Sequence, residues 1–300
     1  MKTKTYLFAL MAMALTLGSC SDNENGIGGE TSKYITVSTS IGNMTRVATD
    51  ANGGQTFEEG DEISVYAWTG DATIAPDASE RVVNNAINKL TNGSWVSTPQ
   101  MLWKNNRDKH YFIGVYPTAA ISDLTAGEYT FDVNKQTESD LLVAVNPDGL
   151  SYSADAQQTV PLTFTHVMAK LAVKLTYKNQ WGGIPTVEKV VVGNAAKEAT
   201  IKYLTKVVTP STTAKEDFSL PEITENTKYV SVIIPQEDVK QLTIVIGGKN
   251  FVYDNGTPFK LESGKITTVN LEVGRDEIKL GDVKITDWED GSTFSGEALN

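Results

Sequence analysis

The chain has 300 residues and a mass of 32.5 kDa, and its 40% hydrophobic and 21% charged side chains exclude disorder as the main state. The formal net charge of −11 excludes the diffuse basic surface that binds a phosphate backbone, so we expect no nucleic acid partner. One cysteine excludes an internal disulfide, and two histidines are too few for an imidazole-rich metal site. We therefore expect no metal and no cofactor.

The N-terminus has the pattern of a secretion signal. Lys2 and Lys4 precede an apolar run over residues 6–17, which is too short to cross a bilayer as a mature helix. The run ends in the letters LGSC at Cys20, an arrangement that resembles a bacterial lipobox, in which small residues admit the signal peptidase and the thiol carries a diacylglyceryl group. We predict a signal peptide over residues 1–19 and lipid attachment at Cys20. The alternative is an ordinary signal peptide with a cysteine there by chance.

Residues 20–32 form the next segment, which is rich in serine, asparagine, glycine and acids, with Ile27 as its one large apolar residue. Such a segment cannot bury a core and is predicted to be a flexible tether. Several acyl chains on one terminus anchor a protein more stably than a single chain does. Stable anchoring to a membrane is therefore expected. We expect that membrane to be the outer membrane, and Asp22 and Glu24 beside the lipid are compatible with export to the cell surface.

The rest of the chain is predicted to be all-β, because apolar and polar residues alternate while Gly, Asn and Asp recur at short intervals. One short helix is expected within residues 77–90. The spacing suits two β-sandwich domains of about seven strands each, in series. The expected strands span residues 34–41, 62–68, 110–116, 127–133, 141–145, 160–174, 187–192, 199–203, 229–234, 242–246, 250–253, 266–273 and 283–288.

The predicted boundary between the two domains lies in a turn-rich polar stretch over residues 146–159, which contains Pro147, Asp148 and Gly149. This places an N-terminal domain at residues 33–159 and a C-terminal domain at residues 160–300. The long apolar strand that follows the stretch is expected to open the second domain.

No catalytic constellation stands out, so we expect no enzyme. The densest carboxylate cluster, residues 58–62, is better explained as a turn before a strand, since a glycosidase needs two carboxylates on facing elements. His166 is expected to be a packing residue and His110 a surface residue. The five tryptophans could stack on sugars, although in a sandwich they more often fill the core.

A set of local patterns in a fixed order carries a resemblance to a known family. They are the lipobox at Cys20, Thr45-Arg46, the pattern from Phe57 through Gly60-Asp61 to Tyr66, Trp103 before His110-Tyr111-Phe112 and Tyr116-Pro117, Phe164-x-His166-x-x-Ala169-Lys170-Leu171, Gly264-Lys265 and Ile285-Thr286-Asp287-Trp288. Together they resemble the fimbrillin family of surface lipoproteins, in its minor-fimbria-like branch. The resemblance implies two transthyretin-like β-sandwich domains, export as a lipoprotein, and assembly with other fimbrial subunits into fimbriae by strand exchange.

The family also implies that a protease cuts after an arginine and removes a first strand. Here the matching bond joins Arg46 and Val47. The preceding strand alternates, so Ile35, Val37, Thr39 and Ile41 are expected to point one way and fill a groove between sheets. Loss of this strand would leave the groove and unpaired edges open to a strand from another subunit.

Three functions remain open from the sequence. The leading one is a structural or adhesive fimbrial subunit, which could be a tip, an anchor or a terminating subunit, because the residues after Trp288 form a poor donor strand with only Phe294 and Leu299 as large apolar residues. The second is a lipid-anchored surface protein that binds a glycan or host ligand and never polymerises. The third, a secreted glycosidase, has only abundant carboxylates in its favour.

Overall fold

A computed structural model describes residues 33–42, 57–136, 138–153, 158–254 and 256–288, and within them the protein is built from β-strands with one short 3-10 helix. The predicted all-β class is therefore confirmed. Cys20, Arg46 and Val47 lie outside the described residues, as do the expected signal peptide, the tether and the last twelve residues. Among the helices of the described part, none combines the length and apolar character needed to span a bilayer.

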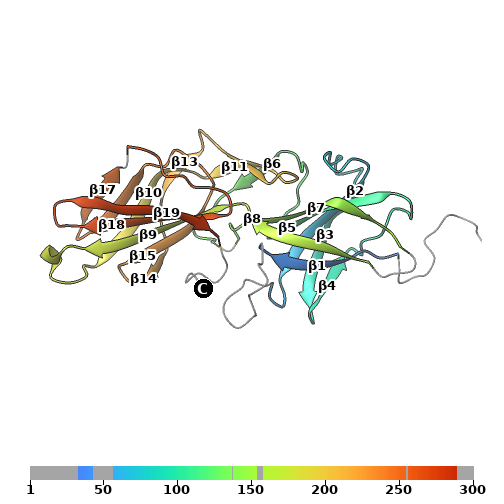
Figure 1. The fold of residues 1–300 in the computed structure, drawn as a ribbon, viewed down its shortest axis with the longest axis horizontal. Coiled ribbons are helices and arrows are strands. Elements are labelled where there is room, and N and C mark those ends of the chain that lie inside the picture. The colour runs from blue at the N-terminus through green and yellow to red at the C-terminus, as the bar shows by residue number, and fades with distance from the viewer. Residues whose placement is uncertain (1–32, 43–56, 137, 154–157, 255, 289–300) are drawn as a thin grey trace, which may run out of the picture.

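The first half of the chain forms a seven-stranded sheet, in the spatial order β1-β8-β7-β5-β2-β3-β4 (Figure 1). All neighbouring strands are antiparallel except β1 and β8, which are parallel. The strands are β1 (Thr36–Ile41), β2 (Glu62–Thr69), β3 (Val83–Thr91), β4 (Ser94–Thr98), β5 (Lys109–Tyr116), β7 (Leu142–Ser151) and β8 (Thr159–His166).

This sheet curls so that its two edge strands approach each other. The Nε1 of Trp95 on β4 donates a hydrogen bond to Oγ1 of Thr39 on β1 at 3.0 Å, and Tyr34 forms an isolated antiparallel bridge with Leu102. The apolar side chains of the inner face form a cluster inside the curl, contributed by Ile35, Val37, Ile41, Ile63, Val65, Ala67, Val83, Ala86, Met101, Trp103, Phe112, Leu142, Ala144, Tyr152, Val160, Leu162 and Phe164.

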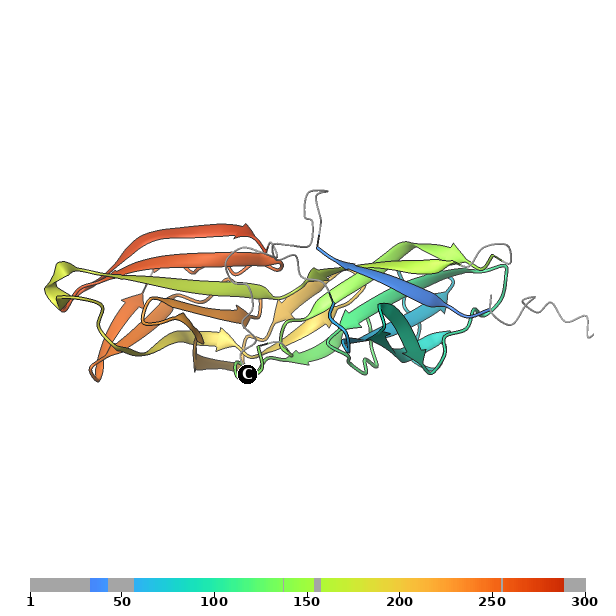
Figure 2. The ribbon, with the colours of Figure 1, turned by 90° about the horizontal axis from the view of Figure 1, so that it is seen from below.

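The second half forms a five-stranded sheet, β14-β15-β9-β18-β19, and a four-stranded sheet, β13-β10-β16-β17. Figure 2 shows them as two layers, and side chains from both share one apolar cluster. The strands are β9 (Ala169–Tyr177), β10 (Val187–Ala196), β13 (Lys215–Ser219), β14 (Glu222–Thr224), β15 (Lys228–Ile233), β16 (Gln241–Ile246), β17 (Lys249–Asp254), β18 (Lys265–Val273) and β19 (Ile278–Asp287), with the 3-10 helix η1 (Asn179–Trp181) after β9.

A three-stranded sheet joins the two halves. Its strands are β6 (Gly127–Thr130), β11 (Glu198–Lys202) and β12 (Val207–Pro210), and β6 from the first half pairs with β11 from the second. The larger apolar cluster is accordingly continuous across both halves, and includes Trp68 and Ile113 as well as Leu171 and Val190. The two halves therefore share a core.

Three local predictions were wrong, two of them because of bulges. The helix expected within residues 77–90 is β3, in which Asn85 takes a φ of 57° at a break in register with β2. The break puts Val83 and Ala86 on the buried face at a spacing of three, which mimics a helix. Residues 146–151, expected in a linker, complete β7 with a bulge at Gly149.

The third error concerns the strand expected over residues 160–174. It is interrupted at Val167 and Met168, so that β8 belongs to the seven-stranded sheet and β9 to the five-stranded sheet. Uniform hydrophobicity gave no sign of this interruption, because both residues at the break are as buried as the strands beside them. The strands β4, β12, β13 and β14 were missed since they are short and mostly exposed.

Arg81 is a buried cation that fixes the loops at one end of the seven-stranded sheet. Its guanidinium donates to the carbonyls of Ile121 at 2.8 Å, Ser122 at 2.7 Å and Pro76 at 3.2 Å, and to the Asn84 side chain at 2.9 Å. It also lies over the ring of Tyr66, 5.4 Å from the centroid. One side chain thus satisfies carbonyls from two separate loops.

The Arg81→Met variant is expected to lose about 3 kcal/mol of unfolding free energy, because buried carbonyls then lack their donors. Urea denaturation followed by tryptophan fluorescence measures the loss. Arg107→Met is the matched control, since Arg107 is exposed, and it should stay within about 0.5 kcal/mol of the wild type. Equal stability of the two variants would contradict the role given to Arg81.

Candidate functional site

The candidate site is β1, an edge strand of the seven-stranded sheet, together with the apolar cluster that its side chains enter. Ile35, Val37 and Ile41 are 2%, 6% and 7% exposed, and Thr39 is half-buried beneath the Trp95 indole. The residues between them, Ser38 and Ser40, are exposed. The alternation along this strand therefore places its apolar side chains in the core and its small polar ones in solvent.

The backbone of β1 pairs with a single strand. Six residue pairs join it to β8 in parallel, from Thr36 opposite Thr159 to Ile41 opposite Phe164. Beyond this ladder, the amide of Ile35 donates to the carbonyl of Met101 at 2.9 Å, and the amide of Gly42 donates to the carbonyl of Phe164 at 2.8 Å. The other side of β1 is closed by side chains, chiefly the bond from Trp95. The segment is therefore joined to the sheet by one ladder, with β8, and by the short bridge between Tyr34 and Leu102.

The two described residues that flank the connection containing Arg46, Gly42 and Phe57, both contact Phe164. Gly42 is bonded to Phe164, and Phe57, on the far side of the connection, packs its ring 5.2 Å from the ring of Phe164. Phe57 also makes edge contacts with Trp95 and Tyr116, each with 5.3 Å between ring centroids. The rings of this aromatic cluster belong to residue 57 and to β4, β5 and β8, so none of them comes from the connection itself.

His110 was expected at the surface, and this prediction was wrong. It is completely buried, with Nε2 accepting from the Lys104 amide at 3.0 Å and Nδ1 lying 3.1 Å from the Asp108 carbonyl, to which it donates. Its ring meets Trp103 edge-on at 4.9 Å. Burial lowers the pKa of His110, and the nearby Asp108 opposes this only in part. The neutral ring thus packs in the interior against Trp103, whereas the basic segment before it favoured a surface position at the start of a strand.

His166 was expected to be a packing residue, and the structure places it in a buried contact with Asp140 and Trp288. The carboxylates of residues 58–62 serve local structure. Asp61 accepts from the Glu58 amide at 2.7 Å, Glu59 accepts from the Asn92 amide at 2.6 Å, and Glu62 pairs with Lys89 at 3.0 Å. Across the described residues, no group of three or more His, Cys, Asp and Glu side chains could hold a metal ion.

The five tryptophans are all buried or half-buried. Trp68, Trp103 and Trp288 are at most 8% exposed, and Trp95 and Trp181 use their indole nitrogens to bond Thr39 and Val273. Packing therefore accounts for the residues that suggested sugar stacking. The tryptophans therefore no longer favour glycan binding over a structural role.

Comparison with known proteins gives a family and a fold. A profile of the fimbrillin-like family matches residues 45–288. A protein assigned to cell adhesion from Bacteroides uniformis has 19% sequence identity and a TM-score of 0.63, over 85% of this chain and 99% of that chain. One from Bacteroides ovatus has 18% identity and a TM-score of 0.62, over 86% and 99%. A fimbrial protein from Bacteroides vulgatus has 14% identity and a TM-score of 0.51, over 84% and 99%. No curated protein shows a significant match.

The buried His110 predicts a pH dependence of stability. Because its folded pKa is lowered, the unfolded chain takes up a proton near the ordinary value of 6.5 while the folded chain does not, so stability is lost as the pH falls below 6.5. The loss is at most about 1.4 kcal/mol for each pH unit between the unfolded and folded pKa values. Urea denaturation at pH 7.5, 6.5 and 5.5 measures it. His110→Gln should show a shallower loss than the wild type, and an equal slope would contradict the assignment.

Proposed function

The chain belongs to the fimbrillin-like family, and on that premise we propose that it is a structural or adhesive subunit of cell-surface fimbriae, exported as a lipoprotein and assembled by strand exchange after proteolysis. Fimbrillins are structural and adhesive proteins, so the chain is not an enzyme. The observation that carries the proposal is the geometry of β1, a strand with apolar side chains in the core whose ladder is formed with one strand, β8.

The two halves are proposed to be two transthyretin-like sandwich domains. The seven-stranded sheet curled around its own cluster would be the first, and the facing five- and four-stranded sheets the second. The boundary that suits the sheets best lies at Val167 and Met168, between β8 and β9, rather than at residues 159 and 160. The pairing of β6 with β11 then forms the bridge between the domains.

Cleavage between Arg46 and Val47 is proposed to release β1. Burial of Ile35, Val37 and Ile41 contributes about 5 to 9 kcal/mol in total, at about 1.5 to 3 kcal/mol for each side chain and before the cost of ordering the strand. While the chain is intact, β1 cannot diffuse away from β8. After cleavage it is held by noncovalent contacts alone, which are this burial and its hydrogen bonds, so another strand with the same alternation can compete for its place.

The vacated place would present three features to an incoming strand. One is the free edge of β8, which runs parallel to β1 over six residues. A second is the apolar wall that includes Trp103, Phe112 and Leu162. The third is the Trp95 indole, which is free to donate to a new hydroxyl when Thr39 departs. These features suit an extended segment of another fimbrial subunit, with apolar side chains at every second position.

Lipid attachment at Cys20 is tested by Cys20→Ala. Because this sulfur is the one thiol in the chain, the variant should lose its acyl chains and move from the membrane fraction to the soluble fraction. Mass spectrometry of the N-terminal peptide measures acylation, and cell fractionation measures location. Ser32→Ala is the control and should remain in the membrane fraction. A variant at Cys20 that still partitions with the membrane would refute the lipoprotein proposal.

Strand release is tested with an arginine-specific protease on the wild type and on Arg46→Ala. The wild type should yield a species that begins at Val47, and its melting temperature should fall by about 5 °C or more, because a core strand can now dissociate. A synthetic peptide of residues 33–42 should restore the melting temperature, and the gain should grow with peptide concentration. Differential scanning fluorimetry and intact-mass analysis measure both effects.

Two controls make this test specific. The same peptide with Val37→Asp should fail to restore stability, because it would bury a carboxylate in the apolar cluster. Arg46→Ala should resist cleavage at residue 46 and keep its melting temperature. If cut and intact protein melt together and the peptide has no effect, β1 is not a displaceable core strand.

A further inference from the structure

The last described strand, β19, is paired with one neighbouring strand, and few of its side chains are buried. It ends the order of the five-stranded sheet and pairs on one side with β18. Ile278 and Leu280 are half-buried, and its other eight residues are exposed. Its ladder with β18 is also interrupted by a bulge between Val269 and Leu271. A strand with so little buried apolar surface is marginal by itself.

Trp288, the residue directly after β19, is by contrast 8% exposed and belongs to the apolar cluster. Its indole stacks on the imidazole of His166 at the end of β8, with 3.9 Å between ring centroids and 6° between planes. The Lys170 ammonium lies 4.0 Å from the same centroid, and the Trp288 amide donates to the Gly264 carbonyl at 3.0 Å. The end of β19 is therefore fixed where β8 passes into β9.

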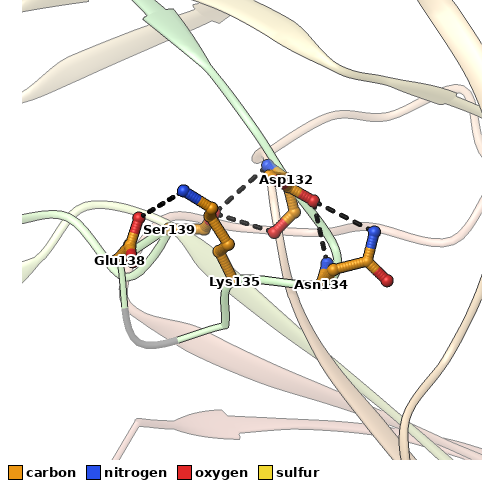
Figure 3. A network of polar contacts seen from close by, with 5 residues as sticks. All are labelled: Asp132, Asn134, Lys135, Glu138 and Ser139. Carbon is orange, nitrogen blue, oxygen red and sulfur yellow. Dashed lines mark hydrogen bonds and ion pairs between the residues drawn. The ribbon is translucent and has the colours of Figure 1, made fainter.

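The imidazole that receives Trp288 is itself held in place. His166 Nδ1 lies 2.9 Å from Oδ1 of Asp140, and the two side chains are 4% and 16% exposed. Asp140 ends the connection between β6 and β7. This connection is braced by the contacts drawn in Figure 3, in which Asp132 and Ser139 exchange hydrogen bonds and Lys135 pairs with Glu138. These contacts restrict movement of the imidazole away from the indole.

The strand beneath β19 is independently supported. β18 pairs with β9 in parallel over eight residue pairs, from Ile266 opposite Lys170 to Val273 opposite Tyr177. Its side chains Val269, Leu271 and Val273 are at most 1% exposed. Detachment of β19 would thus leave a four-stranded sheet whose core strands are intact.

We propose that Trp288 is a clasp that holds β19 as a strap along β18, and that opening the clasp frees the strap while both sheets of the second half stay folded. The two sequence patterns that contribute the clasp, His166 with Lys170 and Trp288 with the residues before it, are 118 to 122 residues apart in the chain and meet only at this point. Release would turn β18 into an open sheet edge, a surface that accepts an added strand.

The claim that Trp288 holds β19 is argued from the contacts described above. A role of β19 release in fimbrial assembly rests, in addition, on the proposed function. Hydrogen exchange followed by mass spectrometry on the full, uncut chain separates the two, because it requires neither cleavage at Arg46 nor a fimbria. In Trp288→Ala, amides of residues 278–287 should exchange at least about tenfold faster than in the wild type. Amides of β9 and β5 should exchange at the wild-type rate.

Trp103→Ala is the matched control. Trp103 is a buried tryptophan, 5% exposed, that also packs on a histidine, but it lies in the seven-stranded sheet. This variant should speed exchange in that sheet and leave residues 278–287 unchanged. His166→Gln, which removes the stacking ring, and Trp288→Phe, which keeps a smaller one, should give a large and a small effect on β19 respectively. These two variants decide the matter if Trp288→Ala does not fold.

Two results would overturn the proposal. One is unchanged exchange of residues 278–287 in both Trp288→Ala and His166→Gln, which would mean that the ladder with β18 holds the strap by itself. The other is an equal acceleration of β9, β18 and β19, which would make Trp288 an ordinary core residue whose loss destabilises the whole half. Failure of strand release at β1 would affect neither outcome.

Discussion

The structure depends most on the connection from β8 to β9. Here one continuous apolar segment contributes a strand first to the seven-stranded sheet and then to the five-stranded sheet. β8 receives β1 along one edge and β7 along the other, and β9 then lies between β15 and β18. Val167 and Met168, at the crossing, are at most 1% exposed. Since a buried backbone needs a partner for each polar group, the crossing can lie only where both sheets supply them, and the Val167 amide donates to the Leu141 carbonyl at 3.0 Å. The strand that pairs with β1 therefore continues directly into the other half.

Side chains, rather than backbone ladders, close the remaining gaps in the sheets. The two edges of the seven-stranded sheet meet through Trp95 and Thr39. The part of β15 that extends beyond its pairing with β14 is covered by Gln136, whose Oε1 accepts from the Val232 amide at 2.7 Å. Lys206 reaches from the turn before β12 to the hydroxyl of Thr165 on β8 at 2.9 Å, and burial lowers the pKa of this lysine. Closure of this kind is specific and local, because a single substitution can remove it without disturbing a ladder.

The strand content could be predicted from the sequence because alternation reports burial directly, and β1, β2, β16 and β18 follow the expected ranges within two residues. The two β-bulges could not be predicted from the sequence. The extra residue at Asn85 imitates the spacing of a helix, and Gly149 imitates a turn. His110 was misplaced because its charged neighbours point outward while its ring points inward. For His166, the sequence reading identified a packing residue but not its partner, because periodicity carries no information on which distant segments meet.

The bridge between β6 and β11 has a mechanical consequence. Four residue pairs join these strands, which run roughly along the long axis of the molecule (Figure 2). Tension along that axis would load the ladder in shear, so that its hydrogen bonds share the load instead of failing one after another. The same pull would have to separate the packed rings of Phe131 and Phe218, 5.3 Å apart across the two halves. A chain with a single cysteine thereby gains resistance to stretching without any covalent cross-link.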